Sequence, residues 1–372
     1  MRVRDIGVKI GVLPTGKENA ITDVSGVRVG HATITSGSGD LVVGEGPVRT
    51  GVTVVMPHDG NVWDEPVFAG CHRLNGNGEM TGLEWVRESG MLTSPIGLTN
   101  THSVGVVRDS LVANAVRDRP PGQLFWALPV VGETWDGMLN DTNGFHVRPE
   151  HVEDAISSAS GGPVTEGGVG AGTGMICFGF KGGIGTASRV VSADDGGYTV
   201  GVLVLANHGR RERLTVEGVP VGQLISLVDA PVPYLPDAPE LSGQGSIIVV
   251  VATDAPLLPI QCRRLAQRAG LGVARTGGVG EHGSGDMFIC FSTGNRQLKS
   301  DTSTAQLTME VKVLLNAHIT ALFDAVVEAT EEAIINCLVA AQTMTGRDNV
   351  IAHALDGHRL AAVMGGNGAQ DN

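Results

Sequence analysis

Short apolar runs with strand-like spacing alternate along this chain with longer stretches of helical spacing. Period-2 or continuous apolar patterns predict strands within residues 19–34, 52–58, 125–131, 246–257 and 286–293. Apolar positions three and four residues apart predict helices over residues 78–89, 102–117, 149–159 and 257–269, and a long one from Ile319 to Cys337. Gly346 is expected to cap that last helix at its C-terminal end.

Between residues 172 and 207, three apolar runs (GMICFGF, TASRVVS and YTVGVLVLA) are separated by the glycine-rich turns KGGIG and ADDGG. This spacing predicts a strand meander with antiparallel pairing. Clustered strands with several intervening helices then favour an α+β layered sandwich over a doubly wound parallel sheet. The last run ends abruptly at Asn207, and a polar side chain at the end of a buried strand is where functional sites are often built.

Residues 229–245 contain four prolines and end in Ser-Gly-Gln-Gly, which predicts an exposed connector before the strand that starts at Ser246. The Ser246 hydroxyl can attack the carbonyl of flexible Gly245, and water can then cleave the resulting ester. That reaction frees an α-amine with a pKa of ~7.7–8.0, which can act as the base for the neighbouring hydroxyl. Gly-Ser is a common dipeptide, however, so this pattern alone favours an ordinary serine before a strand.

Composition and charge narrow the class of protein. The 372 residues exceed the ~250–300 at which single cores stop growing, so one large layered domain or two domains both fit. A net charge of -13 argues against a nucleic-acid partner. The five scattered cysteines predict reduced core thiols in a cytoplasmic protein. No secretory signal or membrane-spanning run is recognised, so no membrane partner is expected.

Several short motifs fail on inspection. Residues 11–17 begin like a phosphate-binding loop, but Glu18 stands where a hydroxyl should bind magnesium. The GxGxxG pattern at residues 278–283 precedes a predicted strand instead of a helix, which excludes a dinucleotide site. The sequence has no HExxH motif or paired histidine spacing, and no GxSxG elbow. We therefore expect no metal and no cofactor.

Long and unusual stretches throughout the chain resemble the DmpA-type family of L-aminopeptidase/D-amidase-esterases and β-aminopeptidases. They are NAITDVSGVRVGH, PIGLTNTHSVG, GETWDGMLND, GGVGAGTGM, VLVLANHG, GSIIVVVATDAPL, HGSGDMFICFST and EATEEAIINCLVAAQTMTGRD. The resemblance implies one αββα sandwich domain over residues 1–372, a precursor that cuts itself into residues 1–245 and 246–372. It also implies a homotetramer of such processed pairs.

The resemblance places the processing serine at Ser246 and a second serine and an acid at Ser284 and Asp286. Some family members carry glutamate at that acid position. Two residues apart on a strand, Ser284 and Asp286 would share one face. The oxyanion-binding asparagine falls on Asn207. Taken singly, each of these residues also fits an ordinary structural role, such as capping a turn or closing a strand end.

The resemblance also indicates where substrate would bind. The acid that recognises the substrate's free amine falls on Glu133, and Trp135, two residues further on, is our own inference for a pocket wall. Many family members have a tyrosine near His146, so histidine there would change the contact that the hydroxyl makes. The resemblance therefore implies an aminopeptidase acting on small peptides, amino-acid amides or esters with a free N-terminus, through acylation of Ser246.

Two other functions stay open from the sequence. One is an acyltransferase of the ornithine acetyltransferase type, a group that uses a processed threonine, whereas this chain has Ser246. The other is an unprocessed, inactive homologue with a binding or regulatory role, against which Asn207, Ser284 and Asp286 argue. The sequence does not choose between α-, β- and D-amino-acyl substrates.

Overall fold

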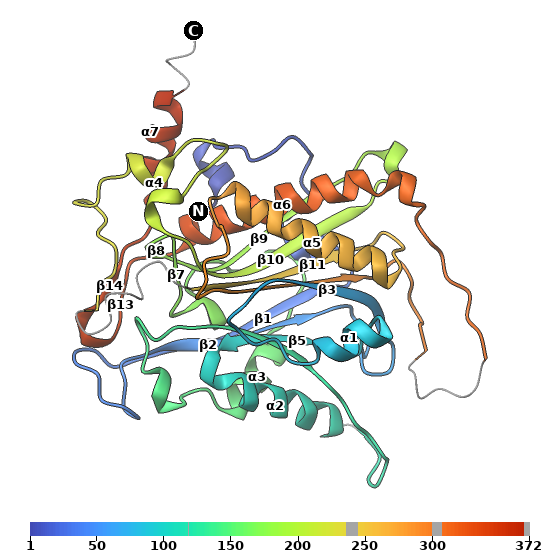
Figure 1. The fold of residues 1–372 in the computed structure, drawn as a ribbon. Coiled ribbons are helices and arrows are strands. Elements are labelled where there is room, and N and C mark those ends of the chain that lie inside the picture. Colours follow the sequence, from blue (N-terminus) through green and yellow to red (C-terminus); the bar gives the residue numbers. More distant parts are fainter. Residues whose placement is uncertain (118, 236–244, 300–306, 368–372) are drawn as a thin grey trace.

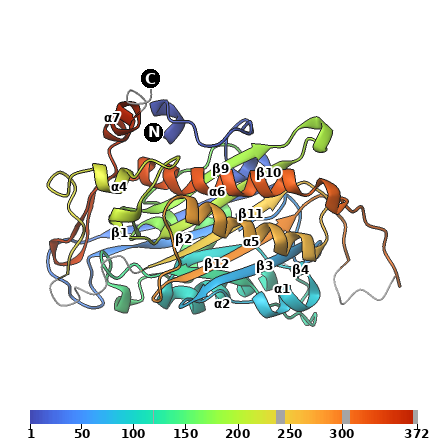
Figure 2. The ribbon, with the colours of Figure 1, turned by 45° about the horizontal axis from the view of Figure 1, so that its top comes forward.

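Two β-sheets lie face to face between two layers of helices (Figures 1 and 2). The structure is a computed structural model that describes residues 1–117, 119–235, 245–299 and 307–367. The larger sheet has the strand order β4 (Met91–Leu92), β3 (Val67–Gly76), β12 (Gly285–Ser292), β11 (Ser246–Thr253), β10 (Thr199–Asn207) and β9 (Gly183–Val190). The smaller sheet has the order β1 (Arg28–Ser36), β2 (Val48–Met56), β5 (Ile96–Asn100) and β6 (Val130–Thr134).

Helices cover the outer face of each sheet. Helices α5 (Pro259–Arg275) and α6 (Thr320–Ala340) lie on the larger sheet, and α2 (Val104–Arg117) and α3 (Pro149–Ser157) lie on the smaller one. Shorter elements complete the described fold: α1 (Leu83–Ser89), α4 (Val221–Leu224), α7 (Gly357–Asn367), the pair β7 (Ile176–Cys177) and β8 (Phe180–Lys181), and the pair β13 (Met344–Thr345) and β14 (Ile351–Ala352). The predicted α+β fold, a four-layer αββα sandwich, is confirmed.

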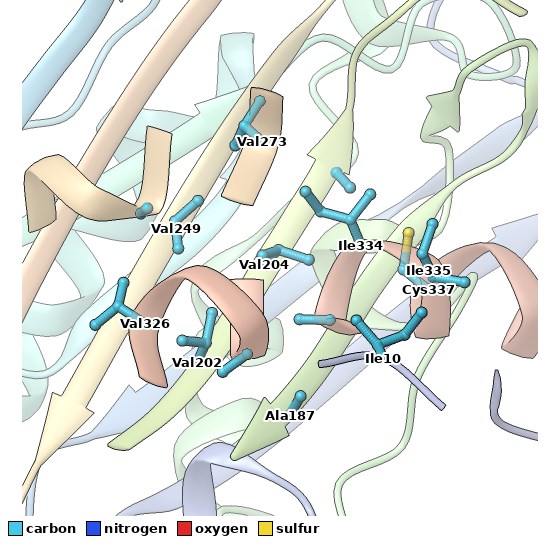
Figure 3. Close-up of a cluster of buried hydrophobic side chains, with 14 of the residues drawn as sticks. Ile10, Ala187, Val202, Val204, Val249, Val273, Val326, Ile334, Ile335 and Cys337 are labelled. Atoms are coloured by element: carbon cyan, nitrogen blue, oxygen red, sulfur yellow. The ribbon is translucent and has the colours of Figure 1, made fainter. Parts of the chain in front are cut away.

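Alternating side chains of the central strand β11 fill two different cores. Ile247, Val249 and Val251 point toward α5 and α6, where they join Val204 of β10 and Ile334 of α6 (Figure 3). The intervening β11 residues face the smaller sheet and pack with apolar residues of β2 and β5. Because both faces of β11 are buried, its sequence is apolar throughout and not alternating, which is typical of a strand buried on both sides.

The strand expected at residues 125–131 is shifted. Strand β6 begins only at Val130, and the exposed fractions of Trp126 and Leu128 are 54% and 41%. The aromatic side chains before β6 make surface contacts instead, with ring centroids 5.9 Å apart for Trp126 and Trp85. The apolar run thus includes a surface aromatic cluster, which hydrophobicity alone does not distinguish from a buried strand.

Two further expectations are wrong in detail. The run GMICFGF forms the two-residue strands β7 and β8 around Phe178, whose φ of 50° breaks an extended strand. Helix α6 ends at Ala340, so Gly346 does not cap it; a side chain at Gly346 would lie 2.3 Å from the carbonyl oxygen of Leu139. Of the expected connector, residues 236–244 lie outside the described part of the chain.

A buried ion network attaches α6 to the larger sheet. Arg189 of β9 has no exposed surface, and its guanidinium binds Glu328 at 2.9 Å and Glu332 at 2.7 Å. Glu332 also binds Arg4 at 2.7 Å. Burial pushes the pKa of Glu332 up, but Arg4 and Arg189 outweigh that effect and hold it below its ordinary value. Removing one partner therefore leaves a buried charge without compensation.

We expect Arg189→Met to lower the free energy of unfolding by about 3–5 kcal/mol, because Glu328 loses its buried cation and Glu332 keeps only Arg4. The matched control is Arg108→Met, which breaks an exposed pair with Asp109 and should cost about 0–1 kcal/mol. Chemical denaturation measures both. Equal stability of the two variants would contradict the role assigned to the network.

Candidate active site

The pairing of three neighbouring strands brings the predicted catalytic residues together. Ser246 is the first residue of β11, and it lies opposite Asn207, the last residue of antiparallel β10. On the other side, β12 runs parallel to β11 and places Asp286 beside Ile247. Ser246 has an exposed fraction of 6%, so the central strand holds its hydroxyl in a nearly buried place.

Gly245 and Ser246 are tightly enclosed. The Ser246 hydroxyl accepts a hydrogen bond from the backbone N–H of Gly285 at 3.0 Å. A side chain on Gly245 would lie 1.7 Å from the carbonyl oxygen of Asn207 and 3.3 Å from its amide nitrogen. Only glycine therefore fits before Ser246, and its backbone lies next to the Asn207 amide.

The Asn207 side chain is fixed by two backbone groups. Its Oδ1 accepts a hydrogen bond from Ile176 N–H at 2.7 Å, and its Nδ2 donates to the carbonyl of Trp135 at 2.8 Å. A primary amide has two N–H donors, so a second one remains beside Gly245. The position suits donation to an oxygen that gains negative charge when a carbonyl there is attacked.

Ser284, just before β12, and Asp286, near its start, form a buried pair. The Ser284 hydroxyl donates to Asp286 Oδ1 at 2.6 Å. Burial raises the pKa of Asp286, while the Ser284 hydrogen bond, His208 and the backbone of Ile247 partly oppose that rise. Gly285 between them donates to Ser246, so the pair is connected to the predicted nucleophile through the intervening peptide.

Ser246 opens onto a cavity of about 470 Å³. Its lining residues are Asn77, Gly78, Glu79, Thr101, Glu133, Trp135, Gly245, Ser246 and Gly283. The structure therefore brings Glu133 and Trp135 to the same cavity as Ser246. Sequence reasoning did not single out Thr101, Glu79, Asn77 or Gly78. Only Thr101 had a signal, because it lies in PIGLTNTHSVG, one of the stretches that carried the family resemblance.

Glu133 presents a buried carboxylate to this cavity. Its exposed fraction is 3%, and it accepts hydrogen bonds from Glu79 N–H at 2.7 Å and from the Thr101 hydroxyl. Burial raises its pKa, while these two hydrogen bonds oppose the rise. In the part of the chain that the structure describes, no cationic side chain forms an ion pair with it. A buried carboxylate facing a cavity suits an ammonium group of a ligand.

His146 lies apart from the cavity lining. Its Nε2 is 2.8 Å from Asp141 Oδ2, which also accepts the N–H of Gly44. The ring is thus held by a neighbouring loop acid. Trp135, in contrast, has two contacts in the site, since it lines the cavity and its carbonyl orients Asn207.

Among residues 1–117, 119–235, 245–299 and 307–367 there is no group of three His, Cys, Asp or Glu side chains placed to bind a metal ion. No helix in these same ranges combines the length and apolar character needed to cross a membrane.

In this αββα sandwich the central strand presents a serine beside an asparagine amide and an acidic cavity. That arrangement defines a class of serine hydrolase whose architecture resembles that of the N-terminal nucleophile enzymes. The model of peptidase family S58 matches residues 19–352, and the chain belongs to that family. It is a hydrolase of the aminopeptidase type. This membership decides against the ornithine acetyltransferase alternative.

Known relatives cover almost the whole chain. It is 49% identical to the beta-peptidyl aminopeptidase BapA of Sphingosinicella microcystinivorans, over 98% of this chain and 91% of that protein. The beta-aminopeptidase structure of a Burkholderia species has a TM-score of 0.90 and 52% identity, covering 98% of this chain and 99% of that one. The L-aminopeptidase D-Ala-esterase/amidase from Ochrobactrum anthropi, a variant of the Ntn hydrolase fold, has a TM-score of 0.89 and 43% identity over 99% of both chains.

We expect Gly245→Ala to prevent the cleavage that the sequence predicts before Ser246, because the added methyl would meet the Asn207 carbonyl at 1.7 Å and displace the Gly245 backbone. Gel electrophoresis and intact-mass spectrometry should show one chain of 372 residues.

Gly105→Ala is the matched control. Gly105 lies in α2 with nothing within 4 Å of an added methyl, and alanine should stabilise the helix by about 0.5–1 kcal/mol. It should leave processing unchanged. Normal cleavage of the Gly245→Ala variant would contradict the geometry described here.

Proposed function

We propose that this protein is a self-processing serine aminopeptidase in which Ser246 is the nucleophile of both its own cleavage and substrate hydrolysis. The observation that carries the proposal is the place of Ser246 at the start of a central strand, next to the Asn207 amide and open to a cavity that contains the buried Glu133 carboxylate. Cleavage gives chains of residues 1–245 and 246–372.

The cleavage step begins with attack of the Ser246 hydroxyl oxygen on the Gly245 carbonyl carbon. The C–N bond between the two residues breaks, the nitrogen takes the proton that the hydroxyl loses, and an ester remains. Water then hydrolyses the ester to give a Gly245 carboxylate and a free Ser246 hydroxyl and amine. The second N–H of Asn207 Nδ2 stabilises the oxyanion of this step, a role supported by the closeness of this amide to Gly245.

Substrate hydrolysis follows the same course. The new α-amine of Ser246 takes the hydroxyl proton, as in enzymes with an N-terminal nucleophile, and the hydroxyl attacks the carbonyl of the substrate's first residue. The amine or alcohol of the substrate leaves with a proton, and water releases the acyl group. Loss of an oxyanion donor such as Asn207 typically lowers the rate by about 10²–10³. Ser284 and Asp286 orient the hydrogen bonds around Ser246.

Glu133 supports an exopeptidase that requires a free N-terminus. Its buried carboxylate pairs with the substrate ammonium, which fixes the first carbonyl near Ser246 in the same cavity. Trp135 forms one wall. The substrates are peptides, amides or esters of amino acids, and the names of the relatives make β-amino-acyl amides the first class to assay beside α-amino-acyl amides.

We also infer a cytoplasmic protein and a homotetramer of processed pairs. The compartment is supported by the five cysteines, all of which are buried and free. The tetramer rests on the family resemblance. Analytical ultracentrifugation of the processed protein measures the assembly directly.

We expect the wild-type protein to separate on denaturing gels into two chains, the second starting Ser-Ile-Ile-Val, and Ser246→Ala to remain one inactive chain. The reason is that alanine has no nucleophile for either reaction. N-terminal sequencing and intact-mass spectrometry measure processing, and release of amine from aminoacyl amides measures turnover. The control is Ser192→Ala, which removes an exposed hydroxyl in the β9–β10 turn. Full activity of Ser246→Ala, or of an intact wild-type chain, would overturn the proposal.

We expect Glu133→Gln to raise KM for aminoacyl amides by about 10- to 100-fold, the worth of a hydrogen bond to a charged group. N-acetylated amides, which lack the ammonium group, should be poor substrates of the wild-type protein and no poorer for the variant. Glu84→Gln changes an exposed acid of α1 and is the control.

The pH dependence provides a second readout of Glu133. Because its pKa is raised by burial, Glu133 should gain a proton at a higher pH than an exposed glutamate does. The wild-type KM should therefore rise as the pH falls through that raised pKa, and the Glu133→Gln profile should lack this rise. Equal turnover of acetylated and free substrates would remove the role proposed for Glu133.

A further inference from the structure

A single peptide unit connects a buried lysine to the Asn207 amide. The carbonyl of Met175 accepts hydrogen bonds from Lys181 Nζ at 3.0 Å and from Gly182 N–H at 2.8 Å. The N–H of the same peptide, which belongs to Ile176, donates to Asn207 Oδ1 at 2.7 Å. An ammonium group, a peptide and a side-chain amide thus form one continuous chain of hydrogen bonds that ends beside Gly245.

Lys181 is unusual in its surroundings. It has no exposed surface, and its three N–H donors are all used on backbone carbonyls, those of Gly172, Met175 and Gly182, at 3.0, 3.0 and 2.8 Å. Among the described residues no carboxylate forms an ion pair with it. Burying a charge is costly, so the three hydrogen bonds to carbonyls have to offset that cost.

We propose that Lys181 is a positioning residue that polarises the Met175–Ile176 peptide and, through it, the Asn207 amide, so that the remaining amide N–H becomes a stronger donor to the oxyanion. A cation on the carbonyl draws electrons from the peptide and strengthens its N–H as a donor. Asn207 Oδ1 accepts that stronger bond, and its Nδ2 donors are strengthened in turn. Hydrogen bonds in such a chain reinforce one another in a medium of low dielectric. The inference rests on the proposed role of Asn207.

Arg211 offers a matched control in the same region. It is also a buried cation that binds backbone carbonyls, those of Phe178, Ala230 and Gly179, at 3.0, 2.8 and 2.7 Å. None of these carbonyls belongs to the peptide that bonds Asn207. Its removal should therefore weaken the fold around the β7–β8 pair without changing the donor strength of Asn207.

The first experiment compares Lys181→Met and Arg211→Met as processed enzymes. We expect both to lower the thermal midpoint, but only Lys181→Met to lower kcat, by about 10-fold, a fraction of the ~10²–10³ that loss of a whole oxyanion donor costs. KM should stay unchanged, because the polarised N–H acts on the transition state. A kcat loss equal in the two variants, or unchanged kcat in Lys181→Met, would overturn the inference.

Lys181→Arg is a second variant, which tests the inference if Lys181→Met does not fold or is not cleaved into two chains. Burial lowers the pKa of Lys181 to about 7, while a negative charge on either of the cysteines that face it, Cys337 on α6 or Cys177 on β7, opposes that change. The sulfur of Cys177 in turn lies 3.7 Å from His208 Nδ1. Burial raises the pKa of the Cys337 thiol, and the nearby Glu166 carboxylate adds to that rise. The lysine loses its charge as the pH rises through about 7, whereas arginine keeps it. The ratio of wild-type to Lys181→Arg kcat should fall across that range, and a flat ratio would contradict the inference.

Asn207→Ala separates failure of this inference from failure of the proposed function. If Asn207→Ala keeps full kcat, Asn207 is not the oxyanion donor and the proposed function is wrong on that point. If Asn207→Ala loses activity while Lys181→Met keeps it, only the lysine inference fails. In the Asn207→Ala background, adding Lys181→Met should have no further effect on kcat, because the two changes act through the same donor.

Discussion

The hydrogen-bonded register of strands β10, β11 and β12 is the constraint on which the rest of this site depends. It places Asn207 opposite Ser246 and Asp286 beside Ile247 through the pairing of the backbones. Because the strands are buried on both faces, a shift of one residue would move every apolar side chain of β11 into the wrong core. The hydrophobic effect therefore fixes the position of the proposed nucleophile, and the site needs no separate device to align it.

That constraint also explains why glycines surround the serine. A side chain on Gly245 would overlap the Asn207 carbonyl, and one on Gly285 would lie 2.5 Å from the carbonyl oxygen of Asn77. The first glycine lets the backbone of residue 245 approach the end of β10, and the second lets the cavity wall approach the start of β12. Close backbone approach is a specific use of glycine, and here it brings three chain segments around one hydroxyl.

The sequence predicts most of the fold because its strongest signals are periodic. The long helix ending near residue 340, the strand that begins at Ser246 and the antiparallel β9–β10 pair all follow from spacing and turns. The strand before Gly132 is misplaced because half-buried Phe125 and exposed Trp126 resemble part of a buried run. Asn207 is found as a strand end, but its partners Ile176 and Trp135 act through backbone atoms. Every residue except proline has the same backbone N–H and C=O groups, so the sequence does not show which of them will bind Asn207.

The buried ionisable groups around Ser246 share one feature: hydrogen bonds hold each of them, and in the described part of the chain none forms a salt bridge with a charged side chain. Glu133 accepts two hydrogen bonds and faces a cavity, Asp286 accepts one from Ser284, and Lys181 donates three to carbonyls. The Arg189 network, in contrast, pairs buried charges with one another. Charges left without such a partner keep their electrostatic effect for a ligand or a transition state, where a low dielectric makes it strongest. The stability they cost is supplied by the apolar sheets on either side, whose packing also prevents these groups from moving to relieve that cost.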